Sequence, residues 1–163
     1  MNSALLYTRI VDYTTQNGFQ LSNIQLSYQL FGQKLGTAPV VMVNHALTGN
    51  SSVTGNGGWW QDLIGNKKPI DTNRYTIIAF NIPGNGYDYV LIENYQDFVA
   101  KDIANLFLLA LNQIGITKLF AIIGGSLGGA IAWEMAALKK DITQHLIPIA
   151  SDWKSTDWLI ANC

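Results

Sequence analysis

One short stretch of the sequence has the residue types and the spacing of a serine nucleophile. Gly124, Ser126 and Gly128 form a Gly-x-Ser-x-Gly motif between an apolar run at 118–123 and a helix-forming run at 130–139. A serine on a sharp turn from strand to helix has a strained backbone and projects its hydroxyl at the end of a sheet. Gly124 and Gly128 are needed because a Cβ at either position would clash across the turn. In this context the motif predicts a nucleophile rather than a glycine-rich turn with an incidental serine.

A serine nucleophile also needs hydrogen-bond donors for the negative oxygen that forms when it attacks a carbonyl group. The backbone N–H of Leu127 follows the nucleophile at a helix N-terminus, where it would point at that oxygen. A second donor is expected from the polar loop at 44–49 (NHALTG), which directly follows a continuous apolar run at 40–43. We assign this second role to the backbone N–H of Leu47.

The base that would accept the proton of Ser126 is not evident. With this kind of nucleophile turn, an acid and then a histidine follow the serine in the chain, and His145 is the only later histidine. His145 precedes a predicted strand and should therefore lie at the opposite edge of the sheet, so we interpret it as structural or solvent-facing. His45 comes before Ser126 and is predicted to orient the 44–49 loop or to bind substrate.

Two aspartates near the end of the sequence are candidates for the acid. Asp152 follows the predicted strand at 146–150 and should lie at the same edge of the sheet as Ser126. We interpret it as a loop or N-cap residue, with a catalytic role as the alternative. Asp157 is interpreted as a surface residue of a helix.

The predicted elements place these residues in an α/β sheet. Runs of apolar residues predict strands at 5–13, 24–31, 40–43, 75–80, 118–123 and 146–150. Helices are predicted at 58–65, 95–114 (N-cap Asn94, stop Gly115) and 130–140, with the start of another at 156–161. The turn Gln16-Asn17-Gly18 predicts a hairpin. Strand–helix alternation from residue 40 predicts a three-layer α/β fold in a single domain, 1–163, with a mostly parallel sheet and an antiparallel N-terminal edge.

The composition excludes several classes of protein. The net charge is −1 and the basic residues are scattered, which argues against nucleic acid and acidic membrane surfaces as partners. No apolar run reaches about 18 residues, and no signal peptide is visible, so neither a membrane span nor export is expected. The single cysteine, Cys163, excludes an internal disulfide and favours a reducing cytoplasm. No metal site is predicted.

Three segments together resemble the homoserine O-acetyltransferase family, whose members have the α/β-hydrolase fold. The loop at 44–49 resembles the His-Ala-Leu-Thr-Gly loop of that family, and 58–75 (GWW, LIG, KPIDT, RY) resembles its next block. The third segment, 125–129 (GSLGG), resembles its nucleophile turn, so that the resemblance covers about residues 40–135. It implies transfer of an acetyl group from acetyl-CoA to L-homoserine in methionine biosynthesis, through an acetyl-serine and without a cofactor. It also implies a homodimer.

The resemblance further implies that this sequence is an N-terminal portion of the fold, truncated before the last strands and the lid. The nucleophile and the oxyanion hole are present, whereas a catalytic histidine and an acid are not identified. We therefore expect the 163 residues alone to have little or no acetyltransferase activity.

Two departures from the family keep other functions open. Leu127 replaces the usual methionine after the nucleophile, which leaves the backbone N–H in place. The loop at 81–89 lacks the usual Gly-Ser-Thr-Gly-Pro segment and instead resembles the Pro-Gly-x-Gly turn of hydrolases. The alternatives are a serine esterase or thioesterase, a transferase that uses serine or succinyl-CoA, and a non-catalytic or split chain that needs a partner.

Overall fold

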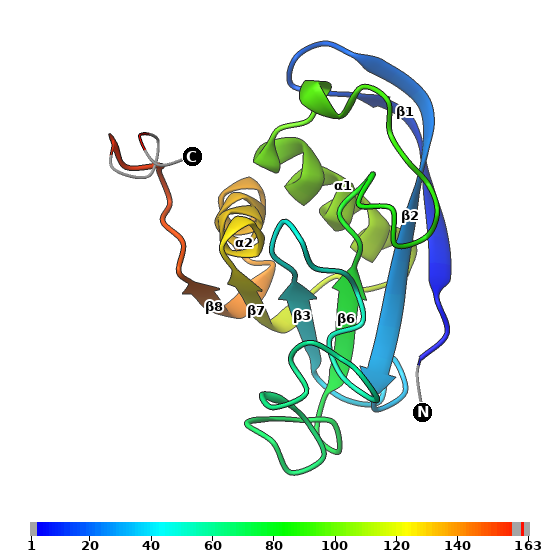
Figure 1. Ribbon diagram of the computed structural model, residues 1–163. Helices are drawn as coiled ribbons and strands as arrows, with labels where there is room; N and C mark the ends of the chain where they lie inside the picture. Colours follow the sequence, from blue (N-terminus) through cyan, green and yellow to red (C-terminus); the bar gives the residue numbers. More distant parts are fainter. Residues whose placement is uncertain (1–2, 158–160, 162–163) are drawn as a thin grey trace.

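The computed structural model of the chain describes residues 3–157 and residue 161. Its main feature is a six-stranded sheet in the order β1-β2-β6-β3-β7-β8 (Figure 1). The strands are β1 (Leu6–Thr14), β2 (Gln20–Gly32), β3 (Val40–Asn44), β6 (Thr76–Phe80), β7 (Leu119–Gly125) and β8 (Thr143–Ile149). Strands β6, β3, β7 and β8 run parallel to one another, whereas β2 runs antiparallel to both of its neighbours, β1 and β6. The predicted mixed sheet with an antiparallel N-terminal edge is thereby confirmed.

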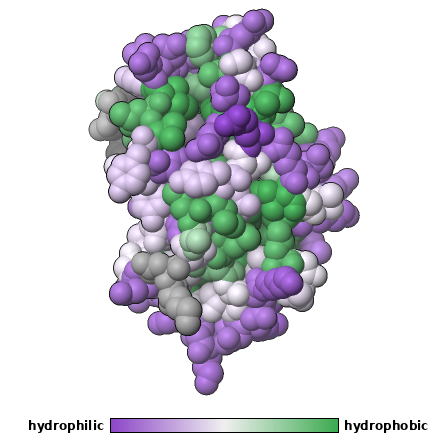
Figure 2. Space-filling view, turned by 90° about the vertical axis from the view of Figure 1, so that its right-hand side faces the viewer, coloured by the Kyte–Doolittle hydropathy of each residue, from purple (hydrophilic) through white to green (hydrophobic). Residues whose placement is uncertain are grey.

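The hairpin of β1 and β2 forms one edge of the sheet. Its turn is closed by the N–H of Gly18, which donates to the carbonyl of Thr15 at 2.9 Å, as the Gln-Asn-Gly sequence predicts. The outer strand β1 exposes apolar side chains at Leu6, Tyr7 and Val11. Figure 2 views the molecule from the side on which β1 and β2 lie, and shows hydrophobic areas among hydrophilic ones. The exposed charges of Arg9 and Asp12 interrupt this strand, which limits edge-to-edge pairing with another chain.

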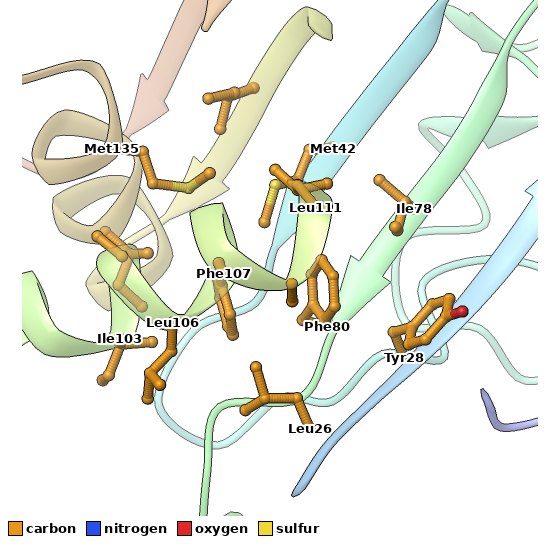
Figure 3. Close-up of a cluster of buried hydrophobic side chains, with 14 of the residues drawn as sticks. Leu26, Tyr28, Met42, Ile78, Phe80, Ile103, Leu106, Phe107, Leu111 and Met135 are labelled. Carbon is orange, nitrogen blue, oxygen red and sulfur yellow. The ribbon is translucent and has the colours of Figure 1, made fainter. Parts of the chain in front are cut away.

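The central strands are buried on both faces, as their continuous apolar sequences predict. Met42, Ile78 and Phe80 belong to a cluster that contains the inner faces of both helices (Figure 3). The alternate residues of the same strands lie in a second cluster on the other face: Val41, Val43, Ile77 and Ala79. The sheet therefore has two packed faces, and its polar chemistry is restricted to the strand ends and loops.

Two helices, α1 (Ala100–Gln113) and α2 (Leu127–Leu138), cover one face of the sheet. The helix predicted at 95–114 is wrong at its start, where the chain forms a short 3-10 helix, η1 (Tyr95–Asp97), and then an extended residue, Val99. The side chain of Asn94 makes no cap bond. Instead Asp102 accepts the N–H of Val99 at 3.1 Å, and this bond favours a new start at Ala100. The predicted stop at Gly115 is confirmed by its φ of +85°.

The segment between β3 and β6 covers the other face of the sheet. All of this segment is described, and it contains no helix. The helix predicted at 58–65 is wrong, because the N–H groups of Trp59 and Trp60 bond back to the carbonyls of Ser52 and Val53. The segment contains only the short parallel pair β4 (Ile64–Gly65) and β5 (Ile70–Asp71). The third layer predicted for this fold is thus a folded loop rather than a helical layer.

The remaining boundaries differ modestly from the prediction. Helix α2 begins directly after Ser126, three residues before the predicted start, and β8 begins at Thr143 instead of 146. Pro148 lies within β8 and is paired in register with Gly124. Of the helix predicted at 156–161, residues 158–160 lie outside the described part of the chain.

Candidate active site

Ser126 lies on the sharp turn between β7 and α2. Its backbone has φ +52° and ψ −120°, a conformation that is strained for a residue with a side chain. The turn is held by the Ser126 N–H, which donates to the carbonyl of Ile149 at 2.9 Å, and by the Ser126 carbonyl, which accepts from Gly129 at 2.9 Å. The side chain of Ser126 is exposed and makes no hydrogen bond within the described residues. This is the geometry of a presented nucleophile.

Two glycines of the motif allow the backbone to come close at this turn. A Cβ on Gly124 would lie 2.8 Å from the nitrogen of Gly129 and even closer to the carbonyl of Gly128. A Cβ on Gly128 would lie 2.7 Å from both the Asn44 carbonyl carbon and the His45 oxygen. Because atoms cannot approach so closely, only glycine lets the first turn of α2 contact the end of β3. This contact joins the nucleophile turn to the 44–49 loop.

The two predicted oxyanion donors lie in the wall of one cavity. Leu47 and Leu127 both line a cavity of about 320 Å³ beside the nucleophile turn. Within the described residues, neither backbone N–H donates to another protein group. The Gly49 N–H closes the loop around Leu47 by donating to the carbonyl of Ala46 at 2.9 Å. Two unpaired N–H groups on residues that line one cavity are the kind of donors that an oxyanion needs.

His45 is a buried residue of the 44–49 loop, and both of its ring nitrogens are hydrogen-bonded. Nε2 accepts the N–H of Ile82 at 3.0 Å, so the proton of the neutral ring lies on Nδ1, which donates to the carbonyl of Ala46 at 2.7 Å. Burial lowers the pKa of His45 below its usual value, and the bond to Ala46 opposes this only in part. His45 therefore orients the loop, one of its two predicted roles, and has no free nitrogen for Ser126.

A network of buried polar side chains supports His45 from below. The amide of Asn85 lies 3.5 Å from Nε2 of His45 and donates to the carbonyl of Gly49 at 3.3 Å and to Oδ1 of Asn81 at 3.2 Å. Asn81 also accepts the N–H of Ser51 at 2.8 Å. Because these groups satisfy one another, the network stabilises a single arrangement of the 44–49 and 81–85 loops.

The burial of His45 makes the stability of the fold depend on pH. The pKa of His45 is lower in the folded state than in the unfolded chain. Its contribution to the free energy of unfolding is therefore present above the unfolded pKa and is lost as the pH falls through the folded pKa. We expect the free energy of unfolding of the His45→Gln variant to fall less than that of wild type between about pH 7 and pH 5. Urea unfolding at several pH values measures this difference.

The control for this experiment is His145→Gln, because His145 is exposed. Its free energy of unfolding at about pH 7 should stay close to that of wild type, because the substitution changes an exposed side chain. Parallel curves for His45→Gln and wild type would contradict the proposed coupling of His45 to the loop.

The other candidate residues make their contacts with groups other than the hydroxyl of Ser126. His145 is four residues before the end of β8, paired with Ala121, and its ring contacts that of Phe120 with centroids 4.8 Å apart. Asp152 is an exposed loop residue whose Oδ1 accepts the N–H of Trp153 at 2.7 Å. Asp157 is exposed at the end of the continuously described chain. None of the three hydrogen-bonds with Ser126 in the described structure.

The sequence did not identify Asn81, Asn85 and Ile82 as hydrogen-bond partners of the 44–49 loop and the residues beside it. The available signal was the polar stretch Asn81–Asn85 directly after a strand buried on both faces, where ligands bind in α/β sheets. Neither a group of metal-ligating side chains nor a helix long and apolar enough to cross a membrane occurs within the described residues.

Residues 39–160 match the model of the alpha/beta hydrolase fold, and the chain belongs to this family. Over 96% of its length it is 32% identical to homoserine O-acetyltransferase of Corynebacterium diphtheriae, of which it spans 44%. The predicted resemblance to these acetyltransferases is therefore confirmed, and the chain spans less than half the length of this relative.

Solved structures agree on the fold. Homoserine O-acetyltransferase from Staphylococcus aureus is 25% identical and matches with a TM-score of 0.82, covering 96% of this chain and 49% of its own. Esterase E22 is 23% identical and matches with a TM-score of 0.84, covering 97% of this chain and 50% of its own. The same half of the fold thus occurs in a transferase and in an esterase.

Proposed function

We propose that this chain provides the nucleophile and the oxyanion hole for transfer of an acetyl group from acetyl-CoA to L-homoserine. The observation that carries the proposal is the position of Leu47 and Leu127, with unpaired N–H groups, in one cavity wall beside the strained Ser126 turn. The similarity to homoserine O-acetyltransferases supports the choice of acetyl-CoA and homoserine, a reaction of methionine biosynthesis. Acetyl-CoA is a substrate here rather than a bound cofactor.

In the proposed mechanism, the hydroxyl of Ser126 attacks the thioester carbonyl. The N–H groups of Leu47 and Leu127 stabilise the negative oxygen, and each such donor contributes about 2.7–4 kcal/mol to lowering the barrier. The C–S bond then breaks, CoA leaves with a proton on sulfur, and an acetyl-serine remains. The hydroxyl of homoserine attacks this ester, releases O-acetylhomoserine and returns the proton to Ser126.

We further propose that the base and its acid partner are not among these 163 residues. Both ring nitrogens of His45 are hydrogen-bonded, and His145 of β8 contacts the ring of Phe120 of β7 rather than Ser126. The 163 residues alone should then turn over acetyl-CoA and homoserine roughly 10⁶-fold more slowly than a full-length relative, as expected when the base of a serine enzyme is missing.

Two measurements test this proposal. Release of CoA thiol from acetyl-CoA with homoserine measures turnover, and a fluorophosphonate probe measures the reactivity of the serine. We expect very slow turnover, slow labelling of wild type and of Ser155→Ala, and no labelling of Ser126→Ala. Ser155 is a matched control because it is an exposed serine beyond β8.

Each proposed role can fail separately. Turnover comparable to that of a full-length relative would contradict the proposal that the base is missing. Equal labelling of wild type and Ser126→Ala would contradict the proposal that Ser126 is the nucleophile, and would favour a non-catalytic chain.

The turn at 82–86 favours hydrolysis as the second candidate function. Ile82-Pro83-Gly84-Asn85-Gly86 resembles the Pro-Gly-x-Gly turn of hydrolases, and Gly84 has a φ of +80°, which only glycine adopts readily. An acyl-serine formed from an activated ester distinguishes the two reactions. Faster loss of the acyl group when homoserine is added supports transfer, whereas a rate independent of homoserine supports an esterase or thioesterase.

A further inference from the structure

The cavity beside the nucleophile turn is larger than an acetyl group requires. Its volume is about 320 Å³. Since a water molecule has a share of about 30 Å³ in the liquid and a methyl group is of similar size, the methyl of an acetyl group would fill only about a tenth of it. The remaining space is sufficient for several more carbon atoms.

The wall of this cavity suits a hydrocarbon chain. Besides the two oxyanion residues, the lining includes the apolar side chains of Ile82, Pro83, Phe98 and Ile103, and Ala100 where α1 begins. Only two lining side chains are polar, the amide of Asn85 and the hydroxyl of Tyr95. Asn85 is bonded to Gly49 and Asn81, so it is part of the wall rather than a free ligand. An acyl chain here would lose part of its contact with water and gain apolar contacts.

Apart from the two oxyanion N–H groups, which the acyl carbonyl would occupy, the cavity offers no partner for a negative charge. None of its lining residues, all of which belong to the described part of the chain, is basic. The N-terminus of α1 would attract an anion, but the buried carboxylate of Asp102 already lies in that turn and accepts the N–H of Val99. A carboxylate at the end of an acyl chain would therefore be desolvated without compensation.

From its size, its apolar wall and its oxyanion donors, we infer that this cavity binds uncharged acyl chains longer than acetyl, and that Ala100 limits their length. The inference rests on the proposed function, because it makes the cavity the acyl site of the same serine. Butanoyl and hexanoyl groups fit the space, whereas a succinyl group is rejected for its charge. A leucine at position 100 would add three carbon atoms to the wall and remove roughly 90 Å³ from the cavity.

The test measures binding without catalysis. Acetamide, butanamide, hexanamide and succinamate are titrated into the ¹⁵N-labelled Ser126→Ala chain, and the amide shifts of Leu47 and Leu127 are followed by NMR. The carbonyl oxygen of each amide can accept both N–H groups while its chain enters the cavity. Full burial of one methylene tightens Kd about fourfold, so we expect hexanamide to bind at least about tenfold more tightly than acetamide. Succinamate should bind no more tightly than acetamide.

Two substitutions at position 100 test whether the acyl chain of the bound amide lies against Ala100. Ala100→Leu should weaken the binding of hexanamide at least about tenfold and leave the Kd of acetamide unchanged. Ala100→Val should weaken hexanamide binding to an intermediate extent. Ala137→Leu is the matched control, since Ala137 is an exposed alanine of α2 outside the cavity. The amide spectrum of each variant reports whether it is folded.

The inference is overturned by equal affinities for acetamide and hexanamide, by succinamate binding as tightly as hexanamide, or by unchanged hexanamide affinity in folded Ala100→Leu and Ala100→Val. Shifts that spare Leu47 and Leu127 would also overturn it. Failure of Ser126 to become acylated would contradict the proposed function alone, because this binding does not need the serine.

Discussion

Replacing Gly128 with alanine is expected to lower the free energy of unfolding by about 3 kcal/mol. The added Cβ would lie 2.7 Å from the Asn44 carbonyl carbon and the His45 oxygen, which are backbone atoms that cannot rotate away. Relief requires α2 to move away from the end of β3. That movement would separate the N–H groups of Leu127 and Leu47, so fluorophosphonate labelling of Ser126 should fall at least about 100-fold, the cost of one lost oxyanion donor.

The neighbouring Gly125 provides a matched control. A Cβ at Gly125 would meet no atom within 4 Å, and its φ is negative, so Gly125→Ala should keep the wild-type stability within about 0.5 kcal/mol. Urea unfolding and probe labelling are measured on both variants. Equal stability of the Gly125→Ala and Gly128→Ala variants would show that the close contact of α2 with β3 is not required.

Replacing Asp102 with alanine is expected to destabilise the fold by about 3 kcal/mol. Asp102 is completely buried, and its carboxylate accepts the hydroxyl of Tyr13 at 2.9 Å, the N–H of Gln16 at 2.9 Å and the N–H of Val99 at 3.1 Å. The variant would remove the acceptor of the Gln16 and Val99 N–H groups and would leave the Tyr13 hydroxyl only its longer bond, of 3.4 Å, to the backbone carbonyl of residue 102. The hairpin and the helix would then lose most of this polar connection.

Asp62→Ala is the control, because Asp62 is exposed and makes no hydrogen bond within the described residues. Its free energy of unfolding should stay within about 0.5 kcal/mol of wild type. Asp102→Asn should lower the free energy of unfolding less than Asp102→Ala does, because the amide oxygen can still accept a hydrogen bond from one donor. A loss below about 1 kcal/mol in Asp102→Ala would contradict a stabilising role for the network.

Features that depend on local sequence could be predicted well. The nucleophile turn was recognisable because only glycine permits close backbone contact at 124 and 128, and the structure contains both contacts. The central strands were recognisable because a strand buried on both faces needs a continuous apolar run, as in β3 and β6. Both kinds of feature depend on steric and apolar preferences of adjacent residues.

Features that depend on distant partners could not be predicted. Helix α1 begins at Ala100 rather than 95, where Asp102 meets Tyr13 from β1. No helix forms at 58–65, because Trp60 bonds back to Val53 in the covering loop. In both places a hydrogen bond outside the local pattern outweighs a helix propensity of a few tenths of a kcal/mol per residue.

From local sequence, Ser126 is predicted on an exposed turn, and the loops at 44–49 and 81–86 are predicted directly after buried strands. What these two loops do depends on contacts that form only in the folded chain. The N–H of Ile82 occupies Nε2 of His45 across 37 positions of the chain, and this bond makes His45 a support for the loop instead of a base. The contact of Gly128 with Asn44 places Leu47 and Leu127 in one cavity. Such contacts arise from packing between residues remote in sequence, which no local pattern records.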